Sequence, residues 1–128
     1  MDGGARGNPG PAAAGAVAAD DGGEVLLERG RYIGEATNNV AEYKAVLLGL
    51  DLARELGAAE VEVVNDSELV ARQLQGRYKV KNAGLKPLFL ETLEALRGFD
   101  SWSVRTVRRE SNERADELVN EALDQARR

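Results

Sequence analysis

The order of strand and helix patterns is the feature of this sequence that most constrains its fold. Patterns typical of strands, rich in small or alternating apolar residues, cover 12–20, 24–34, 61–66 and 101–109. Patterns typical of helices cover 38–56, 67–76, 85–98 and 112–127. The turn 20–23 joins the first two strands into a hairpin, and helices then alternate with strands. A hairpin followed by β–α–β crossovers predicts a mixed α/β sheet.

The composition limits the chemistry that the chain can perform. Its 128 residues predict a single domain, 1–128, with a core of its own. The chain has no cysteine and no histidine, so a metal site must use oxygen ligands, which favours Mg²⁺, Mn²⁺ or Ca²⁺. A net charge of −5 counts against non-specific nucleic-acid binding. No apolar run has the length of a membrane span and no pattern indicates a strong interface, so we expect a cytoplasmic monomer.

The helix predicted over 38–56 carries an acid in the middle of its apolar side. At about 100° per residue, Tyr43 falls on the polar side, whereas Glu42 lies among Ala45, Gly49 and Ala53. Burying an unpaired glutamate there costs several kcal/mol or shifts its pKa. Two interpretations remain open at this point: a structural glutamate paired with an arginine, or a functional site.

Three further acids are weaker candidates individually. Asp66 ends a predicted strand, where α/β sheets bind ligands, but an Asp–Ser pair before a helix is also typical of an N-cap. Asp116 borders the apolar stripe of the final helix, a position equally typical of a solvated residue. Asp2 precedes two glycines, which is common in turns.

The four acids are more informative as a set. Mg²⁺ prefers hard oxygen ligands and is often held between carboxylates and substrate phosphates. Two such ions about 4 Å apart stabilise both the attacking and the leaving oxygen of a phosphodiester displacement. Carboxylates that converge from two strands and two helices suit that chemistry, although their spacing in the sequence does not by itself bring them together.

Five segments, in order and spacing, resemble a known family. They are "DGGARGNPGPAAAGA", "ATNNVAEYKAVLLGL", "NDSELV", "YKVKN" and "NERADELVNEA". Together they resemble type 1 ribonuclease H over nearly the whole chain, and the series TNNxxE, DS and NxxAD is the most specific part. The resemblance implies a mixed five-stranded sheet, with three antiparallel strands followed by parallel ones, and helices on both faces. It also implies hydrolysis of the RNA strand of an RNA–DNA hybrid to 5′-phosphate and 3′-hydroxyl ends.

The resemblance also implies roles for particular residues. Asp2, Glu42, Asp66 and Asp116 match the family's catalytic carboxylates, which bind Mg²⁺ or Mn²⁺. Five others match its substrate-binding positions: Asn8, Asn38 and Asn39 for base edges and ribose 2′-hydroxyls, and Thr37 and Asn82 for a phosphate of the DNA strand. The alternative for "TNN" is helix capping. Glu68 stands where many relatives carry a glutamine, so its role is left open.

Two departures from the family concern the substrate. The loop "VRRESN" lacks the family's histidine, which implies slower turnover or greater dependence on Mn²⁺. Arg108 or Arg109 can contribute charge there but cannot act as a base near neutral pH. The long basic handle of some relatives is reduced to four residues, Arg77, Lys79, Lys81 and Lys86, which form either a solvated loop or a contact to the duplex. Weak, salt-dependent hybrid binding is expected.

A third departure concerns the first strand. Relatives have an apolar stretch before the first aspartate, whereas here Asp2 follows Met1 directly. A strand shortened at its start leaves backbone groups of its neighbours unpaired and supports Asp2 poorly. The rival to a nuclease is therefore a non-catalytic module that binds hybrid or RNA, or an inactive trimmed domain. A nucleotide-binding loop at "GARGNPG" is disfavoured, because the lysine and the strand–loop–helix order are missing.

Overall fold

The computed structural model describes residues 1–127, apart from the side chain of Arg109. Its strands are β1 (Asp2–Ala5), β2 (Gly10–Ala19), β3 (Val25–Ala36), β4 (Glu60–Asn65) and β5 (Ser101–Thr106). Its helices are α1 (Asn38–Glu55), α2 (Glu68–Leu74), α3 (Lys86–Arg97) and α4 (Glu113–Ala126), with a 3₁₀ turn, η1, at Arg109–Asn112 before α4. The order predicted from the local patterns is observed, with two additions that those patterns did not include: β1 and η1.

The strands pair as an antiparallel group and a parallel group. β1, β2 and β3 form an antiparallel sheet in which Asp2 lies opposite Gly15, and β4 pairs in parallel with β5. The amino group of Met1 donates a hydrogen bond of 3.1 Å to the carbonyl of Val64 and so connects β1 to β4. Three antiparallel strands followed by parallel ones match the predicted fold class, although β1 and β4 share no continuous ladder within residues 1–127.

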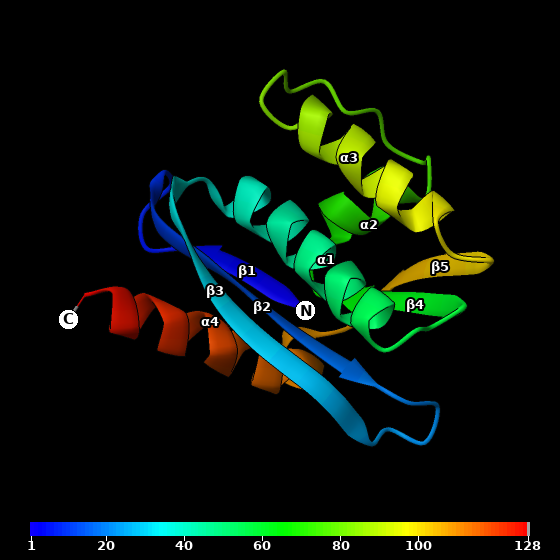
Figure 1. Ribbon diagram of the computed structural model, residues 1–128. Coiled ribbons are helices and arrows are strands. Elements are labelled where there is room, and N and C mark those ends of the chain that lie inside the picture. The colour runs from blue at the N-terminus through cyan, green and yellow to red at the C-terminus, as the bar shows by residue number, and fades with distance from the viewer. Residues whose placement is uncertain (128) are drawn as a thin grey trace.

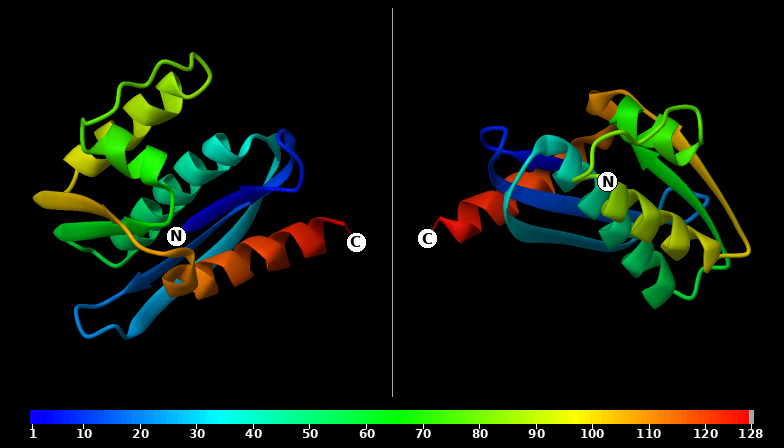
Figure 2. Two further views of the ribbon diagram at one scale, coloured as in Figure 1. Left: turned by 180° about the vertical axis from the view of Figure 1, so that it is seen from behind. Right: turned by 90° about the horizontal axis from the view of Figure 1, so that it is seen from above.

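Helices cover both faces of the antiparallel sheet. Figure 1 shows α1 on one face and α4 on the other, and Figure 2 shows the same arrangement from behind and from above. α1 contacts β1 and β2, whereas α4 contacts β2 and β3. α2 and α3 lie on the same side as α1, near the parallel pair β4 and β5. The carboxylates on α1 and α4 therefore approach β1 from opposite faces of the sheet.

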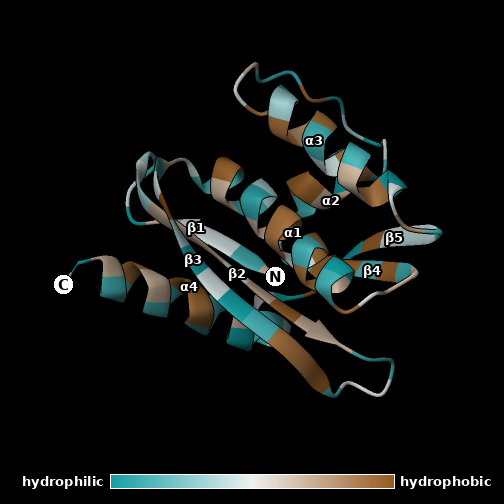
Figure 3. Cartoon of the chain, viewed as in Figure 1, coloured by the Kyte–Doolittle hydropathy of each residue, from teal (hydrophilic) through white to brown (hydrophobic). Residues whose placement is uncertain are grey.

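Small residues on β2 allow both helices to pack closely. Ala14 and Ala16 contact α1, whereas Ala13 contacts α4, as expected for side chains that alternate along a strand. A larger core lies between α1, α2, α3 and the parallel strands, and includes Leu50 and Leu96. Charged and apolar residues alternate over the first four positions of β4 (Figure 3), and Val63, the last of these, lies in that core.

Tyr43 corrects one prediction about α1. The helical projection placed it on the polar side, but it is fully buried in the larger core, and its hydroxyl donates a 2.5 Å hydrogen bond to Oε1 of Gln73. The projection assumed one apolar face. α1 is instead covered by the sheet on one side and by α2 and α3 on another, so a second side of the helix is also buried.

None of the helices within residues 1–127 is both long and apolar enough to cross a membrane.

Candidate active site

A glycine allows α1 to pack directly against β1. A Cβ atom added to Gly3 would lie 2.1 Å from the backbone oxygen of Ala41, so any side chain at this position would push the helix away. The close approach brings Glu42 to the strand, where its Oε1 accepts a 3.2 Å hydrogen bond from the Gly3 amide. Glu42 therefore lies beside Asp2, and only 8% of its surface is exposed.

A second glycine allows α4 to approach from the other face. Gly15, the cross-strand partner of Asp2, would meet the backbone oxygen of Ala115 at 2.4 Å if it carried a Cβ. Because α4 lies so close to β2 at this point, Asp116 is brought to the same end of β1 as Asp2. Asn120, one turn later, donates a 3.2 Å hydrogen bond to the backbone oxygen of Asp116.

Asp2 is anchored through the residue before it. Nδ2 of Asn112 donates a 2.6 Å hydrogen bond to the carbonyl of Met1, and Oδ1 of Asn112 accepts one of 3.3 Å from the Met1 amino group. The amino group also donates to Val64 in β4. Met1 thus links β1 to β4 and to the start of α4, and Asp2 is only 4% exposed. The sequence predicted that the short first strand supports Asp2 poorly, and these contacts correct that prediction.

Asp66 is carried by a turn that Asn65 stabilises. Oδ1 of Asn65 accepts a 3.1 Å hydrogen bond from the amide of Ser67, across Asp66. Asn65 is fully buried, and its backbone oxygen accepts from Val107 at the end of β5. Ser67 then caps α2 by accepting a hydrogen bond from Val70. The predicted N-cap therefore exists, but Ser67 provides it and Asp66 does not.

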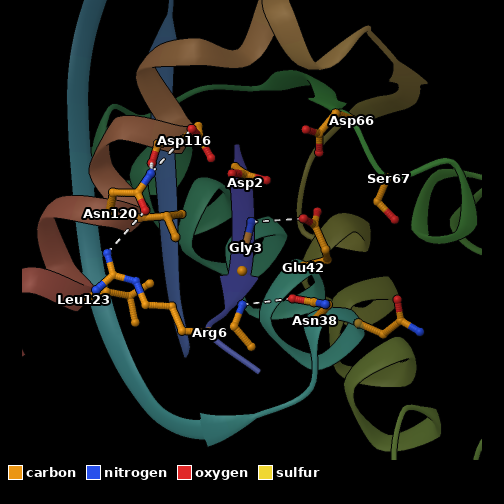
Figure 4. A pocket seen from close by; sticks show the side chains of 14 residues that line it. Asp2, Gly3, Arg6, Asn38, Glu42, Asp66, Ser67, Asp116, Asn120 and Leu123 are labelled. Carbon is orange, nitrogen blue, oxygen red and sulfur yellow. Dashed lines mark hydrogen bonds between the residues drawn. The ribbon is translucent and has the colours of Figure 1, made fainter. Parts of the chain in front are cut away.

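The four predicted acids converge in one open pocket of about 510 Å³, which we call the acidic pocket. In Figure 4, Asp2 lies in the middle, with Asp116 on one side and Asp66 and Glu42 on the other. Oxygen atoms of Asp2, Glu42 and Asp66 lie within 4.8 Å of one another. Asp116 joins them as a half-buried residue of the pocket wall. Among the described side chains, the charged neighbours of Glu42 are the carboxylates of Asp2 and Asp66 and no arginine, which disfavours a structural Glu42–arginine pair.

Burial and crowding of negative charge perturb this group. Burial, together with the Asp2 charge, raises the pKa of Glu42 to about 9. Burial and the charge of Asp66 likewise raise the pKa of Asp2 to about 6. Both shifts reflect a cost of ionisation that a bound cation relieves, because an opposite charge favours the ionised carboxylate.

The residues present fit a divalent cation that prefers oxygen. Oε2 of Glu42 is buried and has no hydrogen-bond partner among the described residues, so a strong acceptor is left unused beside two other carboxylates. Hard carboxylate oxygens are the ligands that Mg²⁺ and Mn²⁺ prefer. Asp2, Glu42 and Asp66 would hold one ion, and Asp2 with Asp116 could hold a second.

The predicted substrate residues lie in two groups. Asn38 and Asn39 line the pocket, and the Asn39 side chain makes no hydrogen bond within residues 1–127. Oδ1 of Asn38 accepts a 2.9 Å hydrogen bond from Ala5, and Asn8 accepts one of 3.0 Å from the Asn38 amide. These bonds tie the glycine-rich loop to the start of α1. The cap of α1 is Thr37, whose side chain accepts from the Val40 amide, so the asparagine amides do not have the capping role that the alternative interpretation of "TNN" gave them.

Asn82 lies outside the acidic pocket. Its Oδ1 accepts hydrogen bonds of 2.7 Å from Gly84 and 3.3 Å from Leu85, which organises the turn before α3. Lys79, Lys81 and Lys86 are exposed on this segment or at the start of α3. Arg108 is exposed as well, whereas the side chain of Arg109 lies outside the described residues.

Several pocket residues were not predicted from the sequence. Arg6 lines the pocket and forms a 2.8 Å ion pair with Asp124, and Ser67 and Asn120 line it too. The available signals were an arginine within the glycine-rich loop and an asparagine four residues after Asp116. Neither pattern is specific, because exposed Arg and Asn are common in loops and on helix surfaces.

Comparison with known proteins places this geometry in a family. The family model described as "Reverse transcriptase-like" matches residues 1–122. The ribonuclease HI of Halobacterium salinarum is 46% identical over 126 residues, which cover 98% of this chain and 63% of that protein. The chain belongs to the type 1 ribonuclease H family. Its predicted fold is confirmed by the crystal structure of the Halobacterium ribonuclease H1, with a TM-score of 0.94.

Two other members of the ribonuclease H family broaden the comparison. The bifunctional protein Rv2228c of Mycobacterium tuberculosis is 47% identical over 98% of this chain, which corresponds to 35% of that protein. The chain therefore spans less than two thirds of these curated relatives. The structure of LC11-RNase H1 in complex with an RNA/DNA hybrid is 48% identical, with a TM-score of 0.95 over 99% of this chain and 96% of that one.

Proposed function

We propose that this chain hydrolyses the RNA strand of RNA–DNA hybrids and leaves 5′-phosphate and 3′-hydroxyl ends. The observation that carries the proposal is the convergence of Asp2, Glu42, Asp66 and Asp116 in one open pocket, with a buried, unpartnered oxygen on Glu42. The relative of similar fold solved with an RNA/DNA hybrid supports the choice of substrate.

The proposed cofactor is Mg²⁺, with Mn²⁺ as a substitute. Divalent ions supply a lowered pKa for the attacking water and stabilise charge on the leaving oxygen. The chain itself contributes the geometry: Gly3 and Gly15 let two helices bring carboxylates to β1, and Asn112 and Asn65 fix the backbone on either side. The Glu42 carboxylate is held by the Gly3 amide, so its second oxygen points toward its acidic neighbours.

Recognition of RNA is proposed to rest on the amides beside the acids. Asn39 is exposed at the pocket with no hydrogen bond to the described residues, so its amide is available to a ribose 2′-hydroxyl or a base edge. Asn8 and Asn38 would act alongside it, and Thr37 and Asn82 would contact the DNA strand. Asn39→Ala is then expected to raise the KM for the hybrid more than it lowers kcat.

The test compares four labelled duplexes in Mg²⁺ and in Mn²⁺: hybrids labelled on the RNA or the DNA strand, double-stranded RNA and double-stranded DNA. The proposal expects cleavage of the RNA strand of the hybrid alone, with 5′-phosphate ends. Hybrid binding without cleavage in either ion would show the non-catalytic module instead. Monomeric state and cytoplasmic location stay predictions, the first testable by sedimentation of the purified chain.

A further inference from the structure

A second hollow lies where the C-terminal part of α2 meets the end of β5. It has a volume of about 190 Å³ and is lined by Ala71, Arg72, Gln75, Arg77, Arg105 and Thr106. We call it the arginine pocket. Three of its six residues are arginine and none is acidic, in a chain whose net charge is −5. Such a local excess of positive charge is unlike the acidic pocket and favours an anion.

Two arginines of the pocket keep the N–H groups of their Nη atoms available to a ligand. Arg72 donates from Nε to Glu68 at 2.6 Å, and Arg105 donates from Nε to Glu62 at 2.9 Å. Among the described residues, neither arginine uses an Nη atom in a hydrogen bond. A guanidinium carries four of its five N–H groups on the Nη atoms, in a planar arrangement that matches the oxygens of a phosphate. Each therefore keeps most of its donors.

The glutamate partners orient these arginines more than they neutralise them. The Glu68 and Glu62 side chains are 64% and 54% exposed, and exposed ion pairs are strongly screened by water. The guanidinium of Arg72 also lies over the ring of Tyr78, 5.7 Å from its centre. Arg77 forms no side-chain hydrogen bond or ion pair within residues 1–127. The hollow is thus bordered by two guanidinium groups held in place, those of Arg72 and Arg105, and by the further cation of Arg77.

We propose that the arginine pocket binds a backbone phosphate of the nucleic acid whose scissile bond lies in the acidic pocket. The inference rests on the proposed function. α2 connects the two sites, because Ser67 at its start lines the acidic pocket and Arg72 and Gln75 line the arginine pocket. A seven-residue helix is only about 10 Å long at 1.5 Å per residue, so one bound strand can reach both sites.

The physical need for such a site follows from the charges at the acidic pocket. The ionised carboxylates of the acidic pocket repel the phosphates of an approaching strand, and affinity for nucleic acid comes mainly from phosphate neutralisation by Lys and Arg. Arginines outside the acidic pocket can provide that attraction without pairing with the carboxylates that bind the cation. Thr106 adds a hydroxyl donor at the same hollow.

The test measures hybrid affinity as a function of salt, in Ca²⁺ or without divalent ions, for the wild-type chain and three variants. Arg105→Gln and Arg77→Gln remove charge from the arginine pocket. Arg97→Gln is the matched control, because Arg97 lies on α3, lines neither pocket and, among the described residues, pairs only with Glu94. Each lost phosphate contact reduces the slope of log affinity against log salt by about 0.9 for duplex DNA, and a similar loss is expected here.

The proposal expects Arg105→Gln and Arg77→Gln each to weaken hybrid binding severalfold at low salt and to flatten the slope, while Arg97→Gln matches the wild type. Arg77→Gln keeps the result interpretable if loss of the Arg105–Glu62 pair harms folding. If the wild type binds and cleaves hybrid but the salt slopes of Arg105→Gln and Arg77→Gln equal that of Arg97→Gln, the role of the arginine pocket is overturned and the proposed function is not. A wild-type chain that neither binds nor cleaves hybrid would overturn the proposed function first.

A separate titration distinguishes a nucleic-acid phosphate from free phosphate. Inorganic phosphate is added to the wild-type chain at constant ionic strength, and the amide resonances of Gln75 and Thr106 are followed by NMR. Shifts that hybrid suppresses by competition support the proposal. If phosphate shifts these amide resonances but the variants keep the wild-type salt slope, the hollow binds a free anion. That result would overturn its role in nucleic-acid binding.

Discussion

Nδ2 of Asn112 donates a 2.6 Å hydrogen bond to the carbonyl of Met1, across 111 positions of sequence. The bond joins the residue before Asp2 to the residue one turn before Asp116. The Met1 amino group also donates to the carbonyl of Val64, which lies two residues before Asp66. The segments that carry Asp2, Asp66 and Asp116 therefore all meet at Met1. Asn112 is thus a positioning residue for the carboxylates.

Loss of this amide is expected to loosen the site as well as the fold. Asn112→Ala leaves a half-buried carbonyl without its partner, which costs about 1–3 kcal/mol in the free energy of unfolding. It should also raise the Mg²⁺ concentration for half-maximal cleavage severalfold, because Asp2 and Asp116 are no longer held together. Metal titrations of cleavage check this, with Gln125→Ala, an exposed α4 position, as the control. An unchanged Mg²⁺ requirement would leave Asn112 a purely structural role.

Gly3 and Gly4 form a matched pair for testing the close approach of α1. Gly3→Ala places a methyl group 2.1 Å from the Ala41 oxygen and must displace the helix, so a loss of stability of about 2 kcal/mol or more is expected, with loss of cleavage. Gly4→Ala meets only a Val119 methyl at 3.6 Å, an ordinary contact. Urea denaturation of both variants checks the difference. Equal stabilities would refute the role given to Gly3.

The raised pKa values predict how stability depends on pH without divalent ions. The folded chain holds protons on Asp2 up to about pH 6 and on Glu42 up to about pH 9, whereas the unfolded chain releases them near pH 4. The folded state therefore binds more protons across this window, and its free energy of unfolding falls as pH rises. The stability that these two protonated carboxyl groups contribute is fully present below about pH 4 and is lost as the pH rises to about 9.

Glu42→Gln isolates this effect. The variant carries no charge at position 42, so the metal-free protein should gain stability relative to the wild type, and the gain should grow from about pH 5 to pH 9. Urea unfolding at several pH values in EDTA measures it. A difference that stays constant or shrinks with rising pH would contradict the assigned ionisation, and added Mg²⁺ should reverse the order by stabilising the wild type.

Local patterns were sufficient to predict most of the fold. The helix predicted over 38–56 is observed as α1, Asn38–Glu55, because an apolar periodicity and a terminal Gly57 define it within the segment itself. The strand predicted over 61–66 is observed one residue earlier, at Glu60–Asn65, so Asp66 follows the strand instead of ending it. That shift places Asp66 on the turn held by Asn65.

The site was only partly predictable. Glu42 could be identified as a candidate from the sequence because it places a charge on the apolar side of a predicted helix, where burial of an unpaired charge is costly. Asp2 and Asp116 carry no such conflict; each was a weak candidate alone, and the resemblance was needed to assign them to the site. The bonds from Asn112 to Met1 join residues far apart in the chain and leave no periodic pattern. The burial of Tyr43 likewise depends on α2 and α3, which the projection of a single helix cannot include.

The central claim is that the four converging acids cleave RNA in a hybrid, and a single-turnover assay with an RNA-labelled hybrid tests it most directly. Wild-type chain and Asp66→Asn are compared in Mg²⁺ and in Mn²⁺, with folding of both confirmed by circular dichroism. The account predicts that the wild type cuts the RNA strand, whereas the variant is folded, binds the hybrid and does not cut. Cleavage by Asp66→Asn at the wild-type rate, or no cleavage by the wild type in either ion, would contradict it.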